Sequence, residues 1–332
     1  MSYVYGIDLG TTYSCISYID EYGKPVVLKN SDGDHTTPSV VMVESESNII
    51  VGTEAKRSIE VEPDKTVQFI KRKMGKENDT VTLNGIEYHA PEISSMILKK
   101  IVSDANEELR QTGVLRDGEE IRDVVITCPA YFGMNERQAT KTAGELAGLN
   151  VLNIINEPTA AAISYGVSGK DKNETVLVYD LGGGTFDVTI MRVADHAYDI
   201  LATDGNSRLG GIDFDKRLVG YIMQELEKQG VNMTNLSEKE KIQLQYKAEQ
   251  IKTSLSVNDQ ALYEHYVNGQ GYGVLITQAI FNEITLDLLK DTEIKVQSTL
   301  QASGLKWEEI DHILLVGGST RMPMIRQMIR LM

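Results

Sequence analysis

An apolar run that ends in Asp-Leu-Gly occurs twice in this chain, and this repeat constrains the fold more than any other feature. The first copy is "YVYGIDLGTTYSCISYI" near the N-terminus, and the second is "VLVYDLGGGTFDVTIMRV" at residues 176–193. Residues 8–10 align with 180–182 and, if one residue is skipped, residues 12–14 align with 185–187. Small and hydroxylated residues therefore fill both turns between alternating apolar strands. The pattern predicts an internal duplication.

The order of predicted elements is also repeated. Each half reads as antiparallel strands followed by alternating strands and helices, which predicts two α/β lobes around mixed sheets. The polar segment 167–174 is the expected boundary, giving lobes at 1–170 and 171–332. Ligands tend to bind in a cleft between two such lobes, so we expect the paired Asp-Gly turns to face each other across it.

The local patterns predict individual elements in both halves. Capping residues, Asn-Gly turns and apolar periodicity are the signals used. In the first half they predict strands at 3–9, 13–20 and 39–43, helices near 53–59 and 64–73, a hairpin turn at Asn84-Gly85, a helix from Pro91 to Gln111, a strand at 121–128, a helix at 134–147, and a strand at 151–155 followed by a helix. In the second half they predict strands at 175–181, 185–193 and 197–203, helices at 211–229 and from Ser237 to about Ser254, a hairpin turn at Asn268-Gly269, a long helix from Thr277 to Gly304, a strand at 312–318 and a final helix.

Bulk properties restrict the classes of protein. The chain has 332 residues, of which 41% are hydrophobic, and no run long enough to span a bilayer, so we expect no membrane partner. The net charge of −15 argues against nucleic-acid binding, which depends on cationic side chains. No leader precedes the first strand, which favours a cytoplasmic protein. Cys15 and Cys128 lie in apolar runs and are expected to be core residues.

The glycine-rich turns are candidate anion sites, because clustered backbone N–H groups without a Cβ bind phosphates. Asp8 and Asp180 are suited to orienting the waters of a Mg²⁺ ion. Two further glycine turns, "LLVGGSTRMP" and "LGGIDFD", each precede a helix, whose dipole favours anions. Ordinary hairpin turns and strand-to-helix loops explain any one of these segments alone. The sequence has neither a Walker-type phosphate loop nor a zinc-protease motif.

Four segments in a fixed order, "GIDLGTTYSC", "NEPTAAA", "DLGGGTFDV" and "VGGSTRMP", are the most specific signature of the chain. Together they resemble the ATPase domain of the 70-kilodalton heat-shock chaperones of the DnaK type, within the actin and sugar-kinase superfamily. The resemblance runs from Tyr3 to the C-terminus. It implies an α/β, actin-like ATPase fold with ribonuclease H-like duplicated lobes around a central nucleotide cleft. It also implies ATP or ADP, Mg²⁺ and K⁺ in that cleft, and slow hydrolysis of ATP.

The resemblance assigns roles to the residues at matching positions. The implied catalytic residues, which position the attacking water and the phosphates, are Lys71, Glu157, Asp180, Thr185 and Asp187. Asp8 and Asp180 would hold Mg²⁺ through water, and Pro129 and Arg137 would form a switch that reports the nucleotide state. The implied nucleotide-binding residues are Asp8, Gly10, Thr11, Thr12, Tyr13, Gly182, Gly183, Gly184, Thr185, Gly210, Gly211, Glu249, Lys252, Ser256, Gly317, Gly318, Ser319 and Arg321.

For two of these residues a plainer interpretation stays open. Lys71 lies within "KRK", which is also compatible with a solvated helix face, and Glu157 before Pro158 is also compatible with a plain helix start.

Some positions depart from the family pattern. The stretch between Lys71 and Pro129 is shorter than in typical members, which implies a trimmed outer part of the first lobe at about 30–115; the outer part of the second lobe is expected at about 212–295. Ile212 stands where an acidic residue is common. We also expect the second lobe to be incomplete at its C-terminus, with no peptide-binding domain in this chain.

The function expected from the resemblance is that of a chaperone ATPase domain whose lobes rotate with the nucleotide state. Its expected partners are the nucleotide, an exchange factor and a J-domain cochaperone, although Leu152 and Asn153 stand where many bacterial members are basic, which weighs against the last. Client peptides would bind only through a domain outside this chain. The alternatives are a sugar kinase, which needs a carboxylate base facing a substrate hydroxyl, and an actin-like filament ATPase.

Overall fold

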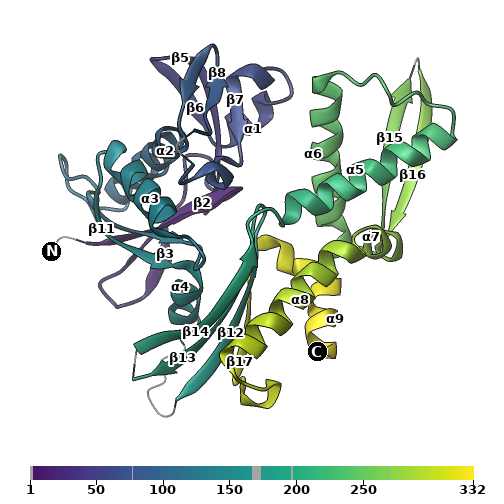
Figure 1. Cartoon of the computed structure of the whole chain (residues 1–332). Helices are drawn as coiled ribbons and strands as arrows, with labels where there is room; N and C mark the ends of the chain where they lie inside the picture. The colour runs from purple at the N-terminus through teal and green to yellow at the C-terminus, as the bar shows by residue number, and fades with distance from the viewer. Residues whose placement is uncertain (1–2, 77, 167–172, 196, 268) are drawn as a thin grey trace. The chain divides into compact units, whose positions relative to one another are not determined.

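The computed structural model describes residues 3–76, 78–166, 173–195, 197–267 and 269–332, apart from the side chain of Glu238. The chain forms two compact units, Met1–Val167 and Ser168–Met332 (Figure 1). Most of the boundary segment expected at 167–174 lies outside the described residues.

Unit 1 is built on a six-stranded mixed sheet in the order β11-β10-β1-β2-β3, with β4 paired to β2. β1 runs parallel to β10 and antiparallel to β2. In Figure 1, α2 and α3 lie on one side of this sheet and α4 on the other. The elements are β1 (Tyr5–Leu9), β2 (Tyr13–Ile19), β3 (Pro25–Val27), β4 (Thr37–Pro38), β10 (Asp123–Cys128), β11 (Asn150–Asn156), α2 (Ala90–Gln111), α3 (Met134–Leu146) and α4 (Glu157–Ser164).

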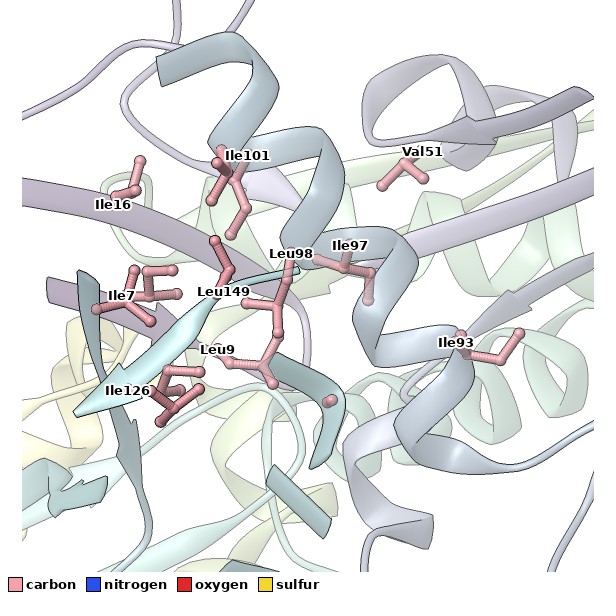
Figure 2. Packing of buried hydrophobic residues seen from close by; sticks show 14 of the residues in the cluster. Ile7, Leu9, Ile16, Val51, Ile93, Ile97, Leu98, Ile101, Ile126 and Leu149 are labelled. Atoms are coloured by element: carbon pink, nitrogen blue, oxygen red, sulfur yellow. The ribbon is translucent and has the colours of Figure 1, made fainter. Parts of the chain in front are cut away.

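The core of unit 1 lies between this sheet and α2. Figure 2 shows Leu98 and Ile101 of α2 among Ile7, Leu9 and Ile126 of the sheet, and all five side chains are buried. Apolar residues three and four apart place one stripe of the helix on the sheet. Pro91 lies in the first turn of α2, as predicted, where its missing N–H costs nothing.

A smaller sheet, ordered β6-β5-β7, and a hairpin complete unit 1. The hairpin predicted at Asn84-Gly85 is confirmed, because both residues have positive φ and join β8 to β9. The helix predicted at 64–73 is wrong. Thr66–Gln68 pairs with β5 as a strand, and Phe69 has φ 64°, which a helix does not allow. The elements are β5 (Val40–Ser45), β6 (Asn48–Val51), α1 (Thr53–Ser58), η1 (Pro63–Lys65), β7 (Thr66–Gln68), η2 (Ile70–Lys73), β8 (Val81–Leu83) and β9 (Ile86–Tyr88).

Unit 2 repeats the central topology of unit 1. Its sheet has the order β14-β13-β12-β17, in which β12 is antiparallel to β13 and parallel to β17. β12 is buried along most of its length, which suits its continuous apolar run. The elements are β12 (Glu174–Leu181), β13 (Phe186–Ala194), β14 (Ala197–Asn206) and β17 (His312–Val316).

The ladder registers correct the alignment of the two copies. Asp8 pairs with Cys15, and Asp180 pairs with Asp187, so seven residues separate the partners in both hairpins. The skipped residue in the expected alignment is therefore wrong. Tyr13 takes the position of Thr185, and Asp187 that of Cys15.

Unit 2 also contains several helices and a second hairpin. The capping box at Ser237 is confirmed, since its Oγ accepts the N–H of Glu240 at 3.3 Å. The hairpin predicted around Asn268-Gly269 is present as β15 and β16, although Asn268 itself lies outside the described residues. The elements are α5 (Gly211–Lys228), α6 (Glu238–Leu255), β15 (Gln260–Val267), β16 (Gln270–Thr277), α7 (Gln278–Ile284), α8 (Leu286–Ser303), η3 (Trp307–Glu309), η4 (Gly318–Arg321) and α9 (Pro323–Leu331).

The long helix predicted from Thr277 to Gly304 is two helices. It breaks at Thr285, which is fully buried and donates its Oγ1–H to the carbonyl of Phe281 at 2.6 Å. A threonine hydroxyl bonded four residues back competes with the helical ladder and often bends it. Thr277 caps the first helix, and Gly304 ends the second with φ 73°, as expected.

Within the described ranges, no helix combines the length and apolar character required to cross a bilayer. Within the described ranges neither cysteine forms a disulfide bond, and Cys128 is buried and Cys15 half-buried, as expected for core residues. Burial raises the pKa of the Cys15 thiol to about 11, so it is protonated near neutral pH.

Candidate functional site

The turn after β1 is clamped by two serines. The N–H of Gly10 donates to Oγ of Ser14 at 3.1 Å, and Oγ of Ser39 donates to the carbonyl of Gly10 at 2.9 Å. A Cβ on Gly10 would lie 2.0 Å from the carbonyl oxygen of Tyr13, so only glycine fits. In the described part of the chain, the amides of residues 11–12 meet no protein acceptor. The turn therefore presents a rigid pair of donors that suits an anion.

Asp8 is the residue before the end of β1, and its side chain is exposed. Its Oδ1 accepts the hydroxyl of Thr127, the residue before the end of β10, at 2.9 Å. This bond fixes the rotamer of the carboxylate and leaves its second oxygen for water or a metal. Thr127 was not predicted as a site residue. The signal that could have identified it is its position near the C-terminal end of β10, which runs parallel to β1.

Tyr13 is exposed and interacts with the first helix of unit 1. Nζ of Lys56 donates to its hydroxyl at 3.0 Å and lies 5.1 Å from the ring centroid. The cation therefore stands over the turn at residues 10–13.

Lys71 and Glu157 form a buried ion pair with an Nζ–Oε1 distance of 2.6 Å. The side chains are 8% and 16% exposed, so Lys71 does not lie on a solvated helix face. Glu157 begins α4, and its carboxylate also holds this ammonium, so it is more than a helix start. Burial raises the pKa of Glu157 above its ordinary value, although the Lys71 ammonium opposes the shift.

Arg137 joins the segment after β10 to the start of α4. Its Nε donates to the carbonyl of Phe132 at 2.9 Å, and its Nη2 donates to Oδ1 of Asn156 at 2.5 Å. Pro129 is buried, and its carbonyl accepts the N–H of Phe132 at 3.2 Å. Because Asn156 precedes Glu157, the Pro129–Phe132 segment is linked mechanically to the ion pair.

Three glycine segments of unit 2 meet backbone to backbone. The N–H groups of Gly211 and Ile212 donate to the carbonyls of Gly182 and Gly183 at 3.0 and 2.9 Å. A Cβ on Gly210 would lie 2.6 Å from the carbonyl carbon of Gly183. The first amides of α5 therefore bond to the 182–184 loop, and Gly210 and Gly211 support that loop through backbone contacts. In the described part of unit 2, the amide of Gly183 itself has no acceptor.

The third segment, after β17, approaches the same loop. Oγ of Ser319 donates to the carbonyl of Gly182 at 2.9 Å. Gly317 has φ 86°, and a Cβ there would lie 2.3 Å from the carbonyl oxygen of Leu181. Glycine is required at this position both by the backbone conformation and by the close approach.

The carboxylates of this unit lie on neighbouring strands. Asp180, in β12, is half-buried and faces the buried Asp187 of β13 in the ladder. Thr185 is half-buried and forms the end of the glycine loop, where its carbonyl accepts the N–H of Gly182 at 3.0 Å. Asp180 and Asp187 therefore lie next to the glycine loop both in sequence and in space.

The residues implied to hold adenosine lie on α6, at Ser256 directly after it, and in the segment that precedes α9. Glu249, Lys252 and Ser256 follow at intervals of three and four residues, which places them on one side of the helix. Ser256 and the exposed Arg321 line one cavity of about 630 Å³, which is in the range of small-molecule sites. The other lining residues are Pro323, Arg326, Gln327, Arg330 and Leu331.

The duplicated unit, whose first strand has an acidic residue near its end and is followed by a glycine turn, defines this chain as an actin-like ATPase fold. The family model described as Hsp70 protein matches residues 4–332. The chain therefore belongs to the Hsp70 family, which is a family of ATP-dependent chaperones.

One relative shows the extent of the similarity. The chaperone protein DnaK of Thermosipho melanesiensis is 44% identical over 336 residues, which cover 99% of this chain and 54% of the relative. The chain thus spans about half the length of this curated relative. The match favours a chaperone over the sugar kinase and filament alternatives.

Proposed function

We propose that this chain binds ATP and hydrolyses it slowly to ADP and phosphate, as the nucleotide-binding part of a chaperone. The observation that carries the proposal is the meeting of three glycine segments with Ser319 in unit 2. Glycine is the usual residue where a backbone approaches a ligand closely. The meeting of three glycine segments therefore indicates a surface that binds a ligand. Membership of the Hsp70 family identifies that ligand as a nucleotide.

The phosphates are assigned to the two glycine turns. Thr11, Thr12 and Tyr13 would hold them from unit 1, and the loop at 182–185 from unit 2. The unengaged amides at 11–12 and at Gly183 support this assignment, because they supply donors without reorganisation. The assigned role of Gly210 and Gly211 is to hold the second loop in shape, since their Cβ positions are filled by neighbours.

A Mg²⁺ ion suits the carboxylates that lie near the end of the first strand of each unit. We assign Asp8 and Asp180 to the water shell of the ion, and K⁺ to the same phosphate region. The exposed Asp8, fixed on one side by Thr127, fits a carboxylate that holds hydrated Mg²⁺. When bound, the ion would neutralise charge on the phosphate oxygens.

Hydrolysis needs a positioned water and stabilised charge more than covalent catalysis. Lys71 is assigned to orient the attacking water and to offset negative charge, and Glu157 to fix the Lys71 ammonium by the ion pair of 2.6 Å. Thr185 and Asp187 complete the assigned set with Asp180. Because Lys71 is almost completely buried, its charge is screened little by solvent.

The adenosine is assigned to the face of α6 that carries Glu249, Lys252 and Ser256, with the 317–321 segment opposite. The cavity lined by Ser256 and Arg321 supports this assignment. These residues belong to the proposed second lobe at 171–332, whose outer part is at about 212–295. The proposed first lobe is at 1–170, and its outer part is at about 30–115.

We assign Pro129 and Arg137 to a switch that reports the nucleotide state. Arg137 contacts both the Pro129–Phe132 segment and Asn156, so a change at Glu157 has a direct route to this segment. We propose that lobe rotation is coupled to peptide binding in the longer protein, with exchange factors as partners. The exposed Leu152 and Asn153 weigh against a J-domain partner that requires a basic site. A cytoplasmic location and a role in the stress response complete the proposal.

Calorimetry with and without Mg²⁺ tests the proposal. We expect ADP and ATP to bind this chain in Mg²⁺ and to bind more weakly in EDTA, because removal of the ion leaves the phosphate charge uncompensated. AMP should bind much more weakly than ADP, since it does not reach the loop at 182–185. Equal affinity for AMP and ADP would contradict the assignment of the glycine turns to phosphate, and the absence of any nucleotide binding would contradict the function.

A further inference from the structure

A buried ion pair joins α5 and α6 of unit 2. Oδ1 of Asp215 lies 2.7 Å from Nζ of Lys252, and the two side chains are only 6% and 11% exposed. Nζ of Lys252 also donates to the carbonyl of Gly211 at 2.9 Å. The ammonium is therefore held between a side chain of α5 and the backbone at the start of the same helix.

Gly211 connects this pair to the glycine loop. A Cβ on Gly211 would lie 2.6 Å from Oγ of Ser319 and 3.0 Å from Nζ of Lys252, so both side chains converge on its α-carbon. The N–H of Gly211 and Oγ of Ser319 both donate to the carbonyl of Gly182. The ion pair and the 182–184 loop thus share one set of contacts.

The chemistry of a lysine ammonium makes Asp215 necessary to this arrangement. A lysine side chain has a flexible four-carbon stem and three N–H donors. Nζ donates to the carbonyl of Gly211 and forms an ion pair with Asp215. In the described residues no further partner of the ammonium is found, so an N–H is left for a ligand. Without an opposite charge, a buried ammonium is strongly disfavoured and would move to solvent or lose its proton.

We propose that Asp215 is a positioning residue for nucleotide binding. It holds Lys252 charged and in one rotamer, so that its remaining N–H is directed to the nucleotide while its second bond stabilises the backbone under the phosphate loop. Asp215 itself does not touch the nucleotide. This inference rests on the proposed function and adds to it a residue outside the assigned site.

A double-mutant cycle on ADP affinity tests this role. Lys252→Met should weaken MgADP binding by about 10- to 100-fold, the scale of one hydrogen bond from a charged group. Asp215→Asn should weaken it nearly as much. The double variant should bind ADP no more weakly than Lys252→Met alone, because Asp215 acts only through the lysine. In steady-state hydrolysis, Asp215→Asn should raise KM for ATP more than it lowers kcat.

The control is Glu225→Gln, which removes a half-buried carboxylate of α5 paired with the exposed Lys228 and should leave ADP affinity unchanged. If Asp215→Asn fails to fold because it leaves an unpaired ammonium, the comparison of Lys252→Met with the double variant still decides the question, since neither contains that charge. The inference would be overturned if Asp215→Asn weakened ADP binding by the same factor in wild type and in Lys252→Met. An unchanged ADP affinity in Asp215→Asn would overturn it as well. Wild-type protein that binds no ADP would overturn the proposed function as well, so the two failures are distinct.

Discussion

Lys71→Ala is expected to lower single-turnover ATP hydrolysis by about 10²- to 10³-fold, the scale of losing one charge-stabilising donor at a reaction centre. ATP affinity should change little, because the lysine is assigned to the attacking water and the developing charge rather than to ground-state binding. Rapid mixing with labelled ATP measures the hydrolysis step, and calorimetry measures the affinity.

Lys73→Ala is a matched control for this variant. Lys73 lies in the same 3-10 helix, is about one-third exposed and pairs with Asp79. Its loss should leave hydrolysis nearly unchanged. A Lys71→Ala protein that hydrolyses ATP at the wild-type rate would remove Lys71 from the mechanism.

The stability of Lys71→Ala should depend on pH in a defined direction. Burial raises the pKa of Glu157, and loss of the opposing ammonium raises it further. A carboxyl whose pKa is raised on folding stabilises the protein at low pH, and this contribution is lost as pH rises through the raised pKa. The difference in Tm between wild type and variant should therefore widen from acidic toward neutral pH.

Gly317→Ala is expected to destabilise unit 2 by roughly 2–5 kcal/mol, the combined scale of a left-handed non-glycine residue and of overpacking. The residue has φ 86°, and the new Cβ would lie 2.3 Å from the carbonyl oxygen of Leu181 and 2.7 Å from Oδ1 of Asp180. Any relaxation must displace the strand end that carries Asp180, so MgADP affinity should fall with stability. Urea unfolding and calorimetry measure the two effects.

Gly220→Ala provides the contrast. Gly220 lies inside α5, and apart from its chain neighbours and the backbone of that helix, no atom of the described residues is within 4 Å of its Cβ position. Alanine there should stabilise the helix by roughly 0.5–1 kcal/mol. If Gly317→Ala were as well tolerated as Gly220→Ala, the close approach of the 317 segment to the end of β12 would be wrong.

The repeated Asp-Leu-Gly pattern predicted the duplicated topology, because strand ends and glycine turns are encoded locally. The segment 64–73 was mispredicted since its strand exists only through pairing with β5, a contact between residues far apart in sequence. The break at Thr285 depends on the burial of one hydroxyl, which helical periodicity does not report. Local signals therefore gave the elements that form independently and missed those that tertiary contacts impose.

The candidate site also combines residues that local sequence patterns predict with residues that only tertiary contacts reveal. The glycine turns and their acidic residues were visible in the sequence as patterns. The supporting residues Thr127, Ser39 and Asp215 were not, because each acts through a contact with a residue at least 29 positions away. The close packing of Gly210 against Gly183 is likewise not apparent from the sequence.

The account depends on Asp8 and Asp180 serving the same metal–nucleotide complex. The most direct measurement compares ADP affinity in saturating Mg²⁺ and in EDTA for Asp8→Asn, Asp180→Asn and the double variant. We expect each single substitution to remove most of the gain that Mg²⁺ gives to wild type, and the double variant to lose little more. A full Mg²⁺ gain retained by either single variant, or losses that simply add, would contradict the account.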